Sequence, residues 1–190
     1  MSGPTSFGYQ NLGFGAGGEE PAQTLKLLLT QTADDNQLDF TLGTAKIYFI
    51  TFNDIHFASQ SEFGYKLSDD GGSSYETGYA FGNERVIDDG TAADRKATGQ
   101  DSARLFGDID SGANSLGNGY LYLYNPAESS QPTYSTSHSV TRDNADKHTI
   151  EYGTQMYNTA STINKIRFGL GTTTAAFTSG TISLYELQVG

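Results

Sequence analysis

One short run of the chain alternates strictly between tyrosine and leucine, reading Tyr-Leu-Tyr-Leu-Tyr after a glycine. A period of two is the period of a β-strand, in which successive side chains point to opposite faces. We therefore expect Tyr120, Tyr122 and Tyr124 on one face of a strand and Leu121 and Leu123 on the other. A chain built from many runs of this kind folds into sheets rather than helices.

Similar runs recur along the chain and are separated by clusters of Gly, Asp, Asn and Ser, which favour turns. The predicted strands span residues 24–31, 37–42, 45–57, 62–68, 75–87, 102–107, 118–125, 133–141, 148–157, 161–170 and 180–189. The polar, Ala-rich segment 89–100 is expected to be a long loop or a single short helix. An open sheet of this many strands would curl, so we expect two packed sheets. The predicted fold is all-β, a jelly-roll or lectin-like β-sandwich.

Three local features sharpen this expectation. The run 46–52 is apolar at every position but Lys46 and Thr51, which predicts a central strand covered on both faces and continuing through 53–57 after a bulge. In 181–189 the apolar phase slips between Leu184 and Tyr185, which is typical of a bulge. The Gly-containing clusters at 69–74 and 88–90 indicate tight turns.

The first 22 residues differ from the rest, because aromatic residues there are spaced by glycines without a strand or helix period. Such a segment is either a disordered tail or an extended arm. In the second case Phe7, Tyr9, Leu12 and Phe14 are the expected anchors on a neighbouring subunit. The predicted organisation is an N-terminal arm over 1–22 and a β-sandwich domain over 23–190.

Composition excludes several classes of protein. The net charge of -11 and the scattered basic residues argue against nucleic-acid binding, which needs clustered Lys and Arg. No apolar run approaches the roughly 18 residues of a membrane span, and the N-terminus lacks the features of a signal peptide. The chain contains no cysteine, so it has no disulfide framework and no cysteine zinc site. We expect a chain made in the cytoplasm, with no nucleic-acid or membrane partner.

Catalytic motifs are missing as well. No metalloprotease, serine-hydrolase, redox or phosphate-loop pattern occurs in the sequence. His56 lies in an apolar run, where a hydrogen-bonded and partly buried side chain is expected, while His138 and His148 flank the polar stretch 141–147. The sequence therefore predicts no enzyme, no catalytic residue and no cofactor.

Acidic residues leave two further alternatives open. Asp108, Asp110 and Asn114 are the nearest approach to a calcium loop, but the Gly and closing Glu of an EF-hand are missing, so a solvated turn is expected and no metal. A glycosidase would need two facing carboxylates, usually beside stacking tryptophans, and the chain has Trp 0. The glutamates on predicted strands that keep this alternative open are Glu62, Glu76, Glu151 and Glu186.

Several segments together resemble a known group of proteins. Residues 65–78, the pair 163–168 and 179–187, and residues 46–54 are similar to small virion structural proteins of tailed bacteriophages, common among phages of marine and cyanobacterial hosts. The likeness covers most of 24–189 but not the N-terminal arm. It implies a lectin-like or jelly-roll β-sandwich displayed on a virus particle, and it supplies no catalytic residues.

What the resemblance implies about function is one of a few virion roles. The first is a capsid decoration (cement) protein, expected as a homotrimer on the major capsid protein at the capsid surface of the virion. The second is a tail knob or fibre-tip adhesin whose loops bind host glycans. A polysaccharide depolymerase is a third and weaker alternative. A single domain without a repetitive shaft favours decoration.

Overall fold

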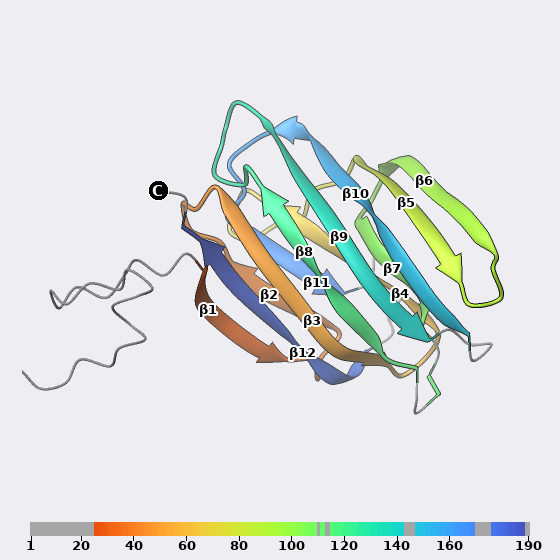
Figure 1. The fold of residues 1–190 in the computed structure, drawn as a ribbon. Coiled ribbons are helices and arrows are strands. Elements are labelled where there is room, and N and C mark those ends of the chain that lie inside the picture. Colours follow the sequence, from red (N-terminus) through yellow and green to blue (C-terminus); the bar gives the residue numbers. More distant parts are fainter. Residues whose placement is uncertain (1–24, 110, 113–114, 143–146, 170–175, 189–190) are drawn as a thin grey trace, which may run out of the picture.

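The computed structural model describes residues 25–109, 111–112, 115–142, 147–169 and 176–188. In this part of the chain every regular element is a β-strand, and the strands form two antiparallel sheets that pack face to face (Figure 1). The all-β sandwich predicted from the sequence is confirmed, whereas the jelly-roll topology stays a prediction.

The larger sheet has eight strands and the smaller has four. The eight-stranded sheet contains, in spatial order, β1 (Leu25–Thr32), β12 (Phe177–Leu187), β3 (Ile47–Phe57), β8 (Gly117–Tyr124), β9 (Pro132–Arg142), β10 (His148–Ala160), β5 (Tyr79–Ile87) and β6 (Ala92–Gln100). The four-stranded sheet contains β2 (Gln37–Thr41), β11 (Lys165–Gly169), β4 (Ser61–Ser68) and β7 (Ala103–Ile109).

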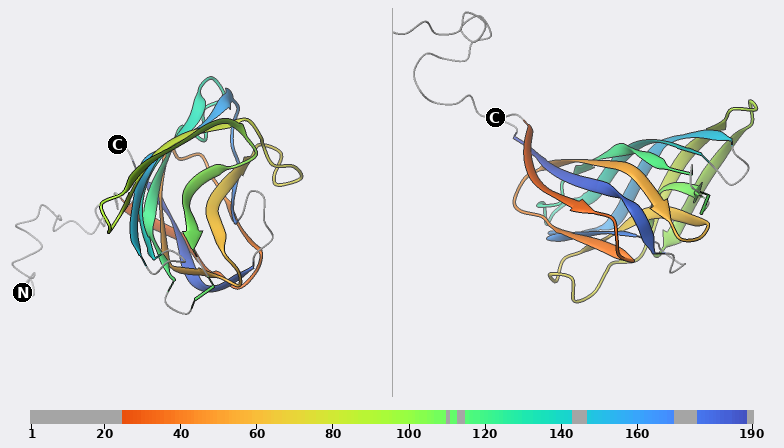
Figure 2. Two further views of the ribbon diagram at one scale, coloured as in Figure 1. Left: turned by 90° about the vertical axis from the view of Figure 1, so that its right-hand side faces the viewer. Right: turned by 90° about the horizontal axis from the view of Figure 1, so that it is seen from below.

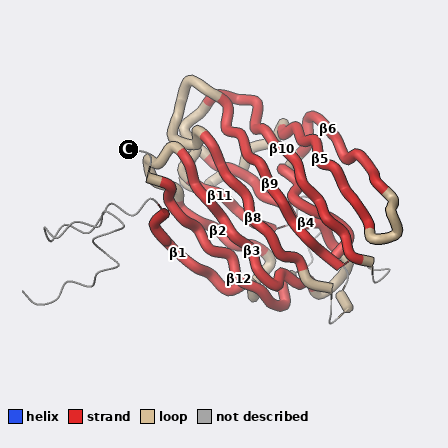
Figure 3. Tube along the Cα trace, viewed as in Figure 1, coloured by secondary structure: helices blue, strands red, loops and turns tan. Residues whose placement is uncertain are grey.

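The eight-stranded sheet is wider than its partner and curves around it, so that β1 and β6 form its two free edges (Figure 2). Strands and short connections account for the whole described chain in Figure 3. None of the described residues forms a helix that is long and apolar enough to cross a membrane.

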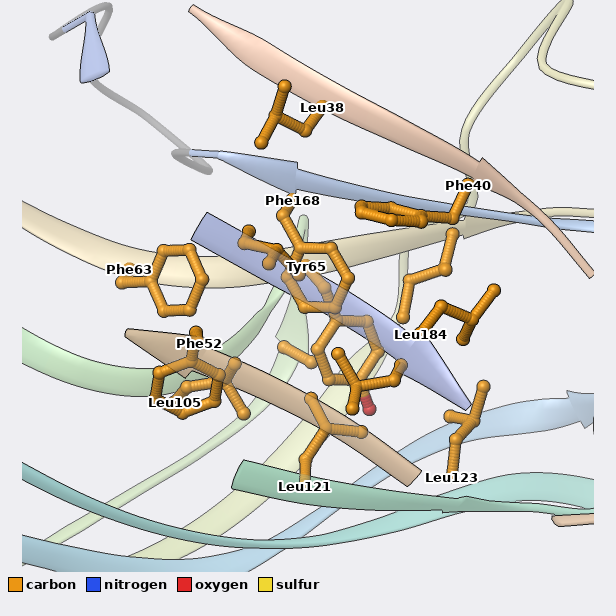
Figure 4. Close-up of a cluster of buried hydrophobic side chains, with 14 of the residues drawn as sticks. Leu38, Phe40, Phe52, Phe63, Tyr65, Leu105, Leu121, Leu123, Phe168 and Leu184 are labelled. Carbon is orange, nitrogen blue, oxygen red and sulfur yellow. The ribbon is translucent and has the colours of Figure 1, made fainter. Parts of the chain in front are cut away.

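The core lies between the sheets and is rich in aromatic side chains (Figure 4). Phe63 of β4 is fully buried at its centre, with ring centroids 4.8 Å from Phe106, 5.1 Å from Phe52 and 5.8 Å from Phe168. Such offset and edge-on ring pairs add to the free energy gained by burying the rings. The inward-facing side chains of the alternating strands therefore form the core that joins the two sheets.

Under β9, β10 and β5 the inner face of the large sheet becomes polar. Gln155 Nε2 donates hydrogen bonds to Ser137 Oγ at 2.9 Å and to Asn83 Oδ1 at 3.1 Å. Asn83 Nδ2 in turn donates to Glu151 Oε1 at 3.1 Å. All four residues are buried, so the network provides the hydrogen bonds that these groups lose with water.

Three expectations need correction. Residues 92–100 form neither a loop nor a helix but the edge strand β6, which pairs with β5. β12 carries no bulge between Leu184 and Tyr185, because its register with β3 runs unbroken from Thr181 to Leu187. The register shift lies instead on the neighbouring β1, between Leu27 and Leu29.

The third correction concerns β3. Its inner residues Tyr48, Ile50 and Phe52 are fully buried, but Ile47 and Phe49 on the outer face are only half-buried by neighbouring side chains. No second layer of described residues covers that face. The bulge predicted before 53–57 is confirmed, since the pairing of β3 with β8 shifts between Phe52 and Ile55.

The predicted turns are also confirmed. Gly71 and Gly72 in the 69–74 turn and Gly90 in the 88–90 turn all have positive φ, which glycine adopts without strain. The side chain of Asp70 organises the first turn, since its Oδ1 accepts hydrogen bonds from Ser68 Oγ and Ser74 N. These hydrogen bonds hold the pKa of Asp70 well below its ordinary value.

Candidate binding face

The outer face of the eight-stranded sheet carries a continuous row of aromatic side chains, which we call the aromatic belt. The belt consists of Tyr185, Phe49, Tyr122, Tyr120, His138 and Tyr152. Neighbouring ring centroids along it are 4.8 to 6.5 Å apart. The belt crosses five consecutive strands, from β12 to β10, which corresponds to about 19 Å across the sheet.

Strand register places these rings together. Phe49 of β3 lies opposite Tyr185 of β12 and opposite Tyr122 of β8, and Tyr120 lies opposite His138 of β9. Cross-strand pairs of this kind have Cβ atoms about 5 Å apart, within reach of aromatic contact. The predicted separation of the tyrosines from Leu121 and Leu123 on β8 is confirmed, and Tyr120 and its neighbours are on the outward face because the two leucines are buried.

Exposed aliphatic side chains extend the apolar character of this face. Val140 of β9, Ile150 of β10 and Val86 of β5 lie in one cross-strand row, and they are 45%, 43% and 36% exposed. A row of large apolar side chains in contact with water marks an interaction surface more often than single exposed residues do. The belt and this row together form a candidate binding face.

A groove lies at the far side of the belt, over β9, β10, β5 and β6, and we call it the outer groove. Its volume is about 740 Å³. Small side chains of β5, Ala80 and Gly82, line it together with the larger Tyr134, Met156 and Lys96. The lining is mainly apolar, and a volume of this size is typical of sites that bind small molecules or peptide side chains.

A smaller hollow of about 290 Å³ continues the outer groove toward the belt. It shares Gly82 and Lys96 with the groove and adds Glu84 and the belt residue Tyr152. Tyr134 and Tyr152 bound the combined hollow at its two ends, about 14 Å apart along the strands. The combined hollow therefore has two aromatic ends, with Lys96 in the cross-strand row between them and the carboxylates of Glu84 and Asp94 in the row of Tyr152.

Strand β1 has an unusual environment for an apolar strand. Leu25, Leu27, Leu28 and Leu29 are all exposed, by 42%, 52%, 38% and 45%, although the strand is paired to β12 on one edge. The four-stranded sheet does not cover it in the way it covers β3 and β8. This free edge is a second apolar surface of the chain.

The structure separates the three histidines. His56 is partly buried and hydrogen-bonded as predicted, with Nε2 at 3.0 Å from the carbonyl oxygen of Gly112 and Nδ1 bonded to Thr178 Oγ1. His138 does not lie beside a loop but in the middle of β9, where it joins the belt. His148 begins β10 and is exposed.

The predicted anchor residues Phe7, Tyr9, Leu12 and Phe14 lie outside the described residues, and so do Asp110 and Asn114 of the calcium alternative. Within the described ranges, no three His, Asp or Glu side chains come close enough to hold a metal ion.

Three of the four candidate glycosidase carboxylates are held by different protein partners, and the fourth, Glu186, is half-buried on β12. Glu62 pairs with Arg104 at 2.6 Å, and Glu76 accepts a hydrogen bond from the Tyr157 hydroxyl at 2.7 Å. Glu151 is buried in the polar network beneath the large sheet. These contacts give each of the three carboxylates a structural role.

The outer face of the four-stranded sheet carries a different, charged cluster. Arg167 donates from Nε to Asp39 Oδ1 at 2.6 Å and from a terminal nitrogen to Asp39 Oδ2 at 2.8 Å. Its guanidinium lies 3.8 Å from the ring centroid of Tyr75, whose hydroxyl also donates to Asp39. Burial and the neighbouring carboxylate raise the pKa of Tyr75 to about 12.

Sequence reasoning found the tyrosines of β8 but not the belt, the outer groove or the charged cluster. The belt joins residues as far apart in sequence as Phe49 and Tyr185, and the signal that pointed to it was the tyrosine alternation alone. Comparison with protein-family models and with curated proteins found no match to this chain.

Proposed function

We propose that this chain is a virion structural protein, a decoration protein that binds the outside of a tailed-phage capsid and stabilises the shell. The observation that carries the proposal is the aromatic belt, an apolar and uncharged strip about 19 Å wide on the open face of a rigid sheet. The resemblance of residues 46–54, 65–78, 163–168 and 179–187 to phage virion proteins gives the biological setting.

The composition of the belt suits a protein partner. Tyrosine is enriched in the cores of protein interfaces, where it buries a large rigid surface at a low cost in conformational entropy. The belt contains four tyrosines with one phenylalanine and one histidine, while the chain as a whole carries a net charge of -11. An uncharged strip on an otherwise acidic protein favours contact with a protein partner through that one face.

Stabilisation of a shell would follow from mass action. A ligand that binds only the assembled lattice lowers the free energy of that lattice by an amount that grows with occupancy. Many copies, each with modest affinity, act together on one particle. The expected assembly is a homotrimer on the major capsid protein, placed at the capsid surface.

A binding experiment with undecorated shells tests the proposal. Replacing Tyr120 and Tyr152 by Ser removes two exposed rings of the belt, and we expect shell affinity to fall at least tenfold, as for interface hot spots. The matched control replaces Thr41 and Thr44, which are exposed near β2 on the other sheet, by Ala. Equal binding by both variants and the unchanged protein would reject the belt as the shell contact.

Deleting residues 2–20 tests the expected contribution of the N-terminal arm. Shell occupancy should be lost while circular dichroism still reports the folded sandwich. Unchanged occupancy of the shortened protein would show that the arm takes no part in attachment.

The second candidate function is a tail knob or fibre-tip adhesin that recognises host-surface glycans. The observation that favours it is the combined hollow, where Tyr134 and Tyr152 offer ring faces and Lys96 and Glu84 offer polar groups. Copy number in purified particles separates the two functions, since hundreds of copies indicate shell decoration and a few to dozens indicate the tail. A glycan array with the purified protein then tests sugar binding directly.

A further inference from the structure

We propose that the outer groove of one copy holds residues 7–14 of a neighbouring copy of the same chain. This inference rests on the proposed function, since it names the site that would receive the N-terminal segment in a many-copy assembly. It joins two features that are otherwise unrelated, an apolar groove on the described sandwich and an aromatic, uncharged sequence that precedes it.

The groove has room for a bulky apolar side chain. A methyl group placed on Gly82 would meet no other atom within 4 Å, so the space above this residue is open. Ala80 beside it is also small, and Tyr134 and Met156 provide large apolar side chains at the margin. Aromatic residues that insert into such a groove bury a large area with few rotatable bonds.

The sequence of the N-terminal segment matches this groove in charge and in character. Residues 2–18 contain no Asp, Glu, Lys or Arg, although the chain carries a net charge of -11. Two copies therefore repel each other over most of their surfaces, and this segment can approach a neighbour without that cost. Phe7, Tyr9, Leu12 and Phe14 supply four apolar side chains within eight residues.

Geometry favours a neighbouring copy over the same chain. The cross-strand row that starts at Leu25 continues through Leu187, Ile47 and Tyr124 and reaches Met156 at the groove after five strand spacings, about 24 Å. Leu25 follows Phe14 by eleven positions, and a flexible sequence of that length has an r.m.s. span of about 18 Å.

Reaching the groove of the same chain would thus need extension beyond the favoured span. It would also draw Glu19 and Glu20 across a row of apolar side chains, where their charges lose hydration. A neighbour whose groove lies within the favoured span avoids both costs, and effective concentration is highest for such a match.

Because the protein contains no cysteine, single introduced cysteines can report the contact between the N-terminal segment and the groove in the full-length chain. One preparation carries Ser6→Cys next to the aromatic segment, and the other carries Thr98→Cys on the groove lining. After mixing and mild oxidation, we expect at least tenfold more disulfide-linked heterodimer than in the matched mixture with Thr41→Cys, an exposed residue of the other sheet.

A second variant blocks the groove itself. Gly82→Trp fills the open space and should abolish the Ser6–Thr98 cross-link, while circular dichroism confirms the fold and Thr41→Trp leaves the cross-link unchanged. Equal linkage to positions 98 and 41 overturns the proposal. So does a disulfide that forms only inside a chain carrying both cysteines, because the occupant would then be the same chain. If the chain without the Trp substitution gives no Ser6–Thr98 cross-link and binds glycans at Tyr134 and Tyr152, the groove is a sugar site and the proposal is overturned.

The outcome is distinguishable from a failure of the proposed function. A chain that coats shells but gives no specific cross-link leaves the decoration proposal standing and rejects the groove contact. A chain that gives the specific cross-link but never binds shells supports the groove contact and rejects the decoration proposal.

Discussion

The hydroxyl of Tyr65 on β4 and the hydroxyl of Ser135 on β9 lie 2.8 Å apart and join the two sheets through a hydrogen bond inside the core. Ser135 Oγ donates its own proton to Gln155 Oε1, so Tyr65 is the donor of the pair. The aromatic core and the buried polar network meet at this bond. The hydrogen bond that joins the aromatic core to the polar network therefore requires the Tyr65 hydroxyl to keep its proton.

Alkaline pH should unfold the protein for this reason. Burial raises the pKa of Tyr65 and of Tyr79, whose hydroxyl accepts a hydrogen bond from the backbone of Leu67. The unfolded chain releases these protons near pH 10, so stability is intact below that pH and falls as the pH rises. We expect a loss of about 1 kcal/mol per buried tyrosine at pH 11.

The measurement is urea unfolding followed by circular dichroism between pH 8 and about 11.5. Tyr65→Phe should flatten the fall at high pH, but it should cost about 1 kcal/mol at pH 7 because the hydrogen bond from Tyr65 to Ser135 is lost. A variant that unfolds as steeply with pH as the original chain would exclude Tyr65 as a source of the effect.

Gln155 should be the most sensitive position of the polar network. Replacing it by Leu keeps the volume but removes partners from Asn83, Ser135 and Ser137, each of which is buried. Unsatisfied buried groups cost about 1–3 kcal/mol each, so we expect a loss of roughly 2–4 kcal/mol in the free energy of unfolding. Thr154→Leu, the next residue on the exposed face of β10, is the control and should change stability little.

How far the sequence predicted this structure can be seen from β8 and β6. The alternation at Tyr120–Tyr124 was recognisable because one face of β8 is buried and the other is not. β6 gave no such signal, since most of its residues are exposed on both faces and it is held mainly by pairing with β5. Backbone pairing at an edge needs no apolar period, so pattern reasoning missed it.

The candidate site depended on register, which the sequence does not reveal. The apolar residue Phe49 looked like part of a doubly covered strand, yet it lies between Tyr185 and Tyr122 on an open face. The supposed bulge at Tyr185 was an outward aromatic residue in the belt. These errors share one cause: aromatic rings shield one another in part, so they are half-buried without a second sheet above them.

Two glycines on neighbouring strands should respond oppositely to alanine. A Cβ on Gly153 would lie 2.5 Å from the carbonyl oxygen of Gly82 and 2.7 Å from Asn83 Cα, so the backbone of β5 would have to shift. We expect Gly153→Ala to destabilise the protein by about 1–3 kcal/mol. Gly82→Ala meets open space and should stay within about 0.5 kcal/mol.

Thermal unfolding of the two variants side by side makes this comparison. Equal melting temperatures would contradict the close approach of β10 to β5 at Gly153. The same pair also verifies that Gly82 can be enlarged without loss of the fold.

Phe63 should carry more of the core energy than other single residues near it. Its ring contacts Phe52, Phe106 and Phe168 from both sheets. Phe63→Ala would leave a cavity between them, and we expect a loss of about 3–5 kcal/mol. Phe63→Leu restores part of the volume and should recover a measurable share of that loss in denaturant unfolding.

The cluster of Asp39, Arg167 and Tyr75 should make stability fall in acid. Burial alone would raise the pKa of Asp39, but hydrogen bonds from Arg167 and Tyr75, with the positive charge of Arg167, outweigh it and hold the pKa below its ordinary value. The folded protein thus binds this proton less tightly than the unfolded chain, so the contribution is present above about pH 4 and is lost as the pH falls further. Because both side chains of the Asp39–Arg167 pair are still partly exposed to solvent, the contribution of the pair to stability should be only about 0.5–1 kcal/mol. Asp39→Asn should remove this part of the acid dependence, whereas Asp34→Asn, an exposed carboxyl, should leave it in place. Unfolding free energies measured between pH 3 and about 7 decide the matter, and parallel curves for Asp39→Asn and the unchanged protein would show that Arg167 gains nothing from the carboxylate charge.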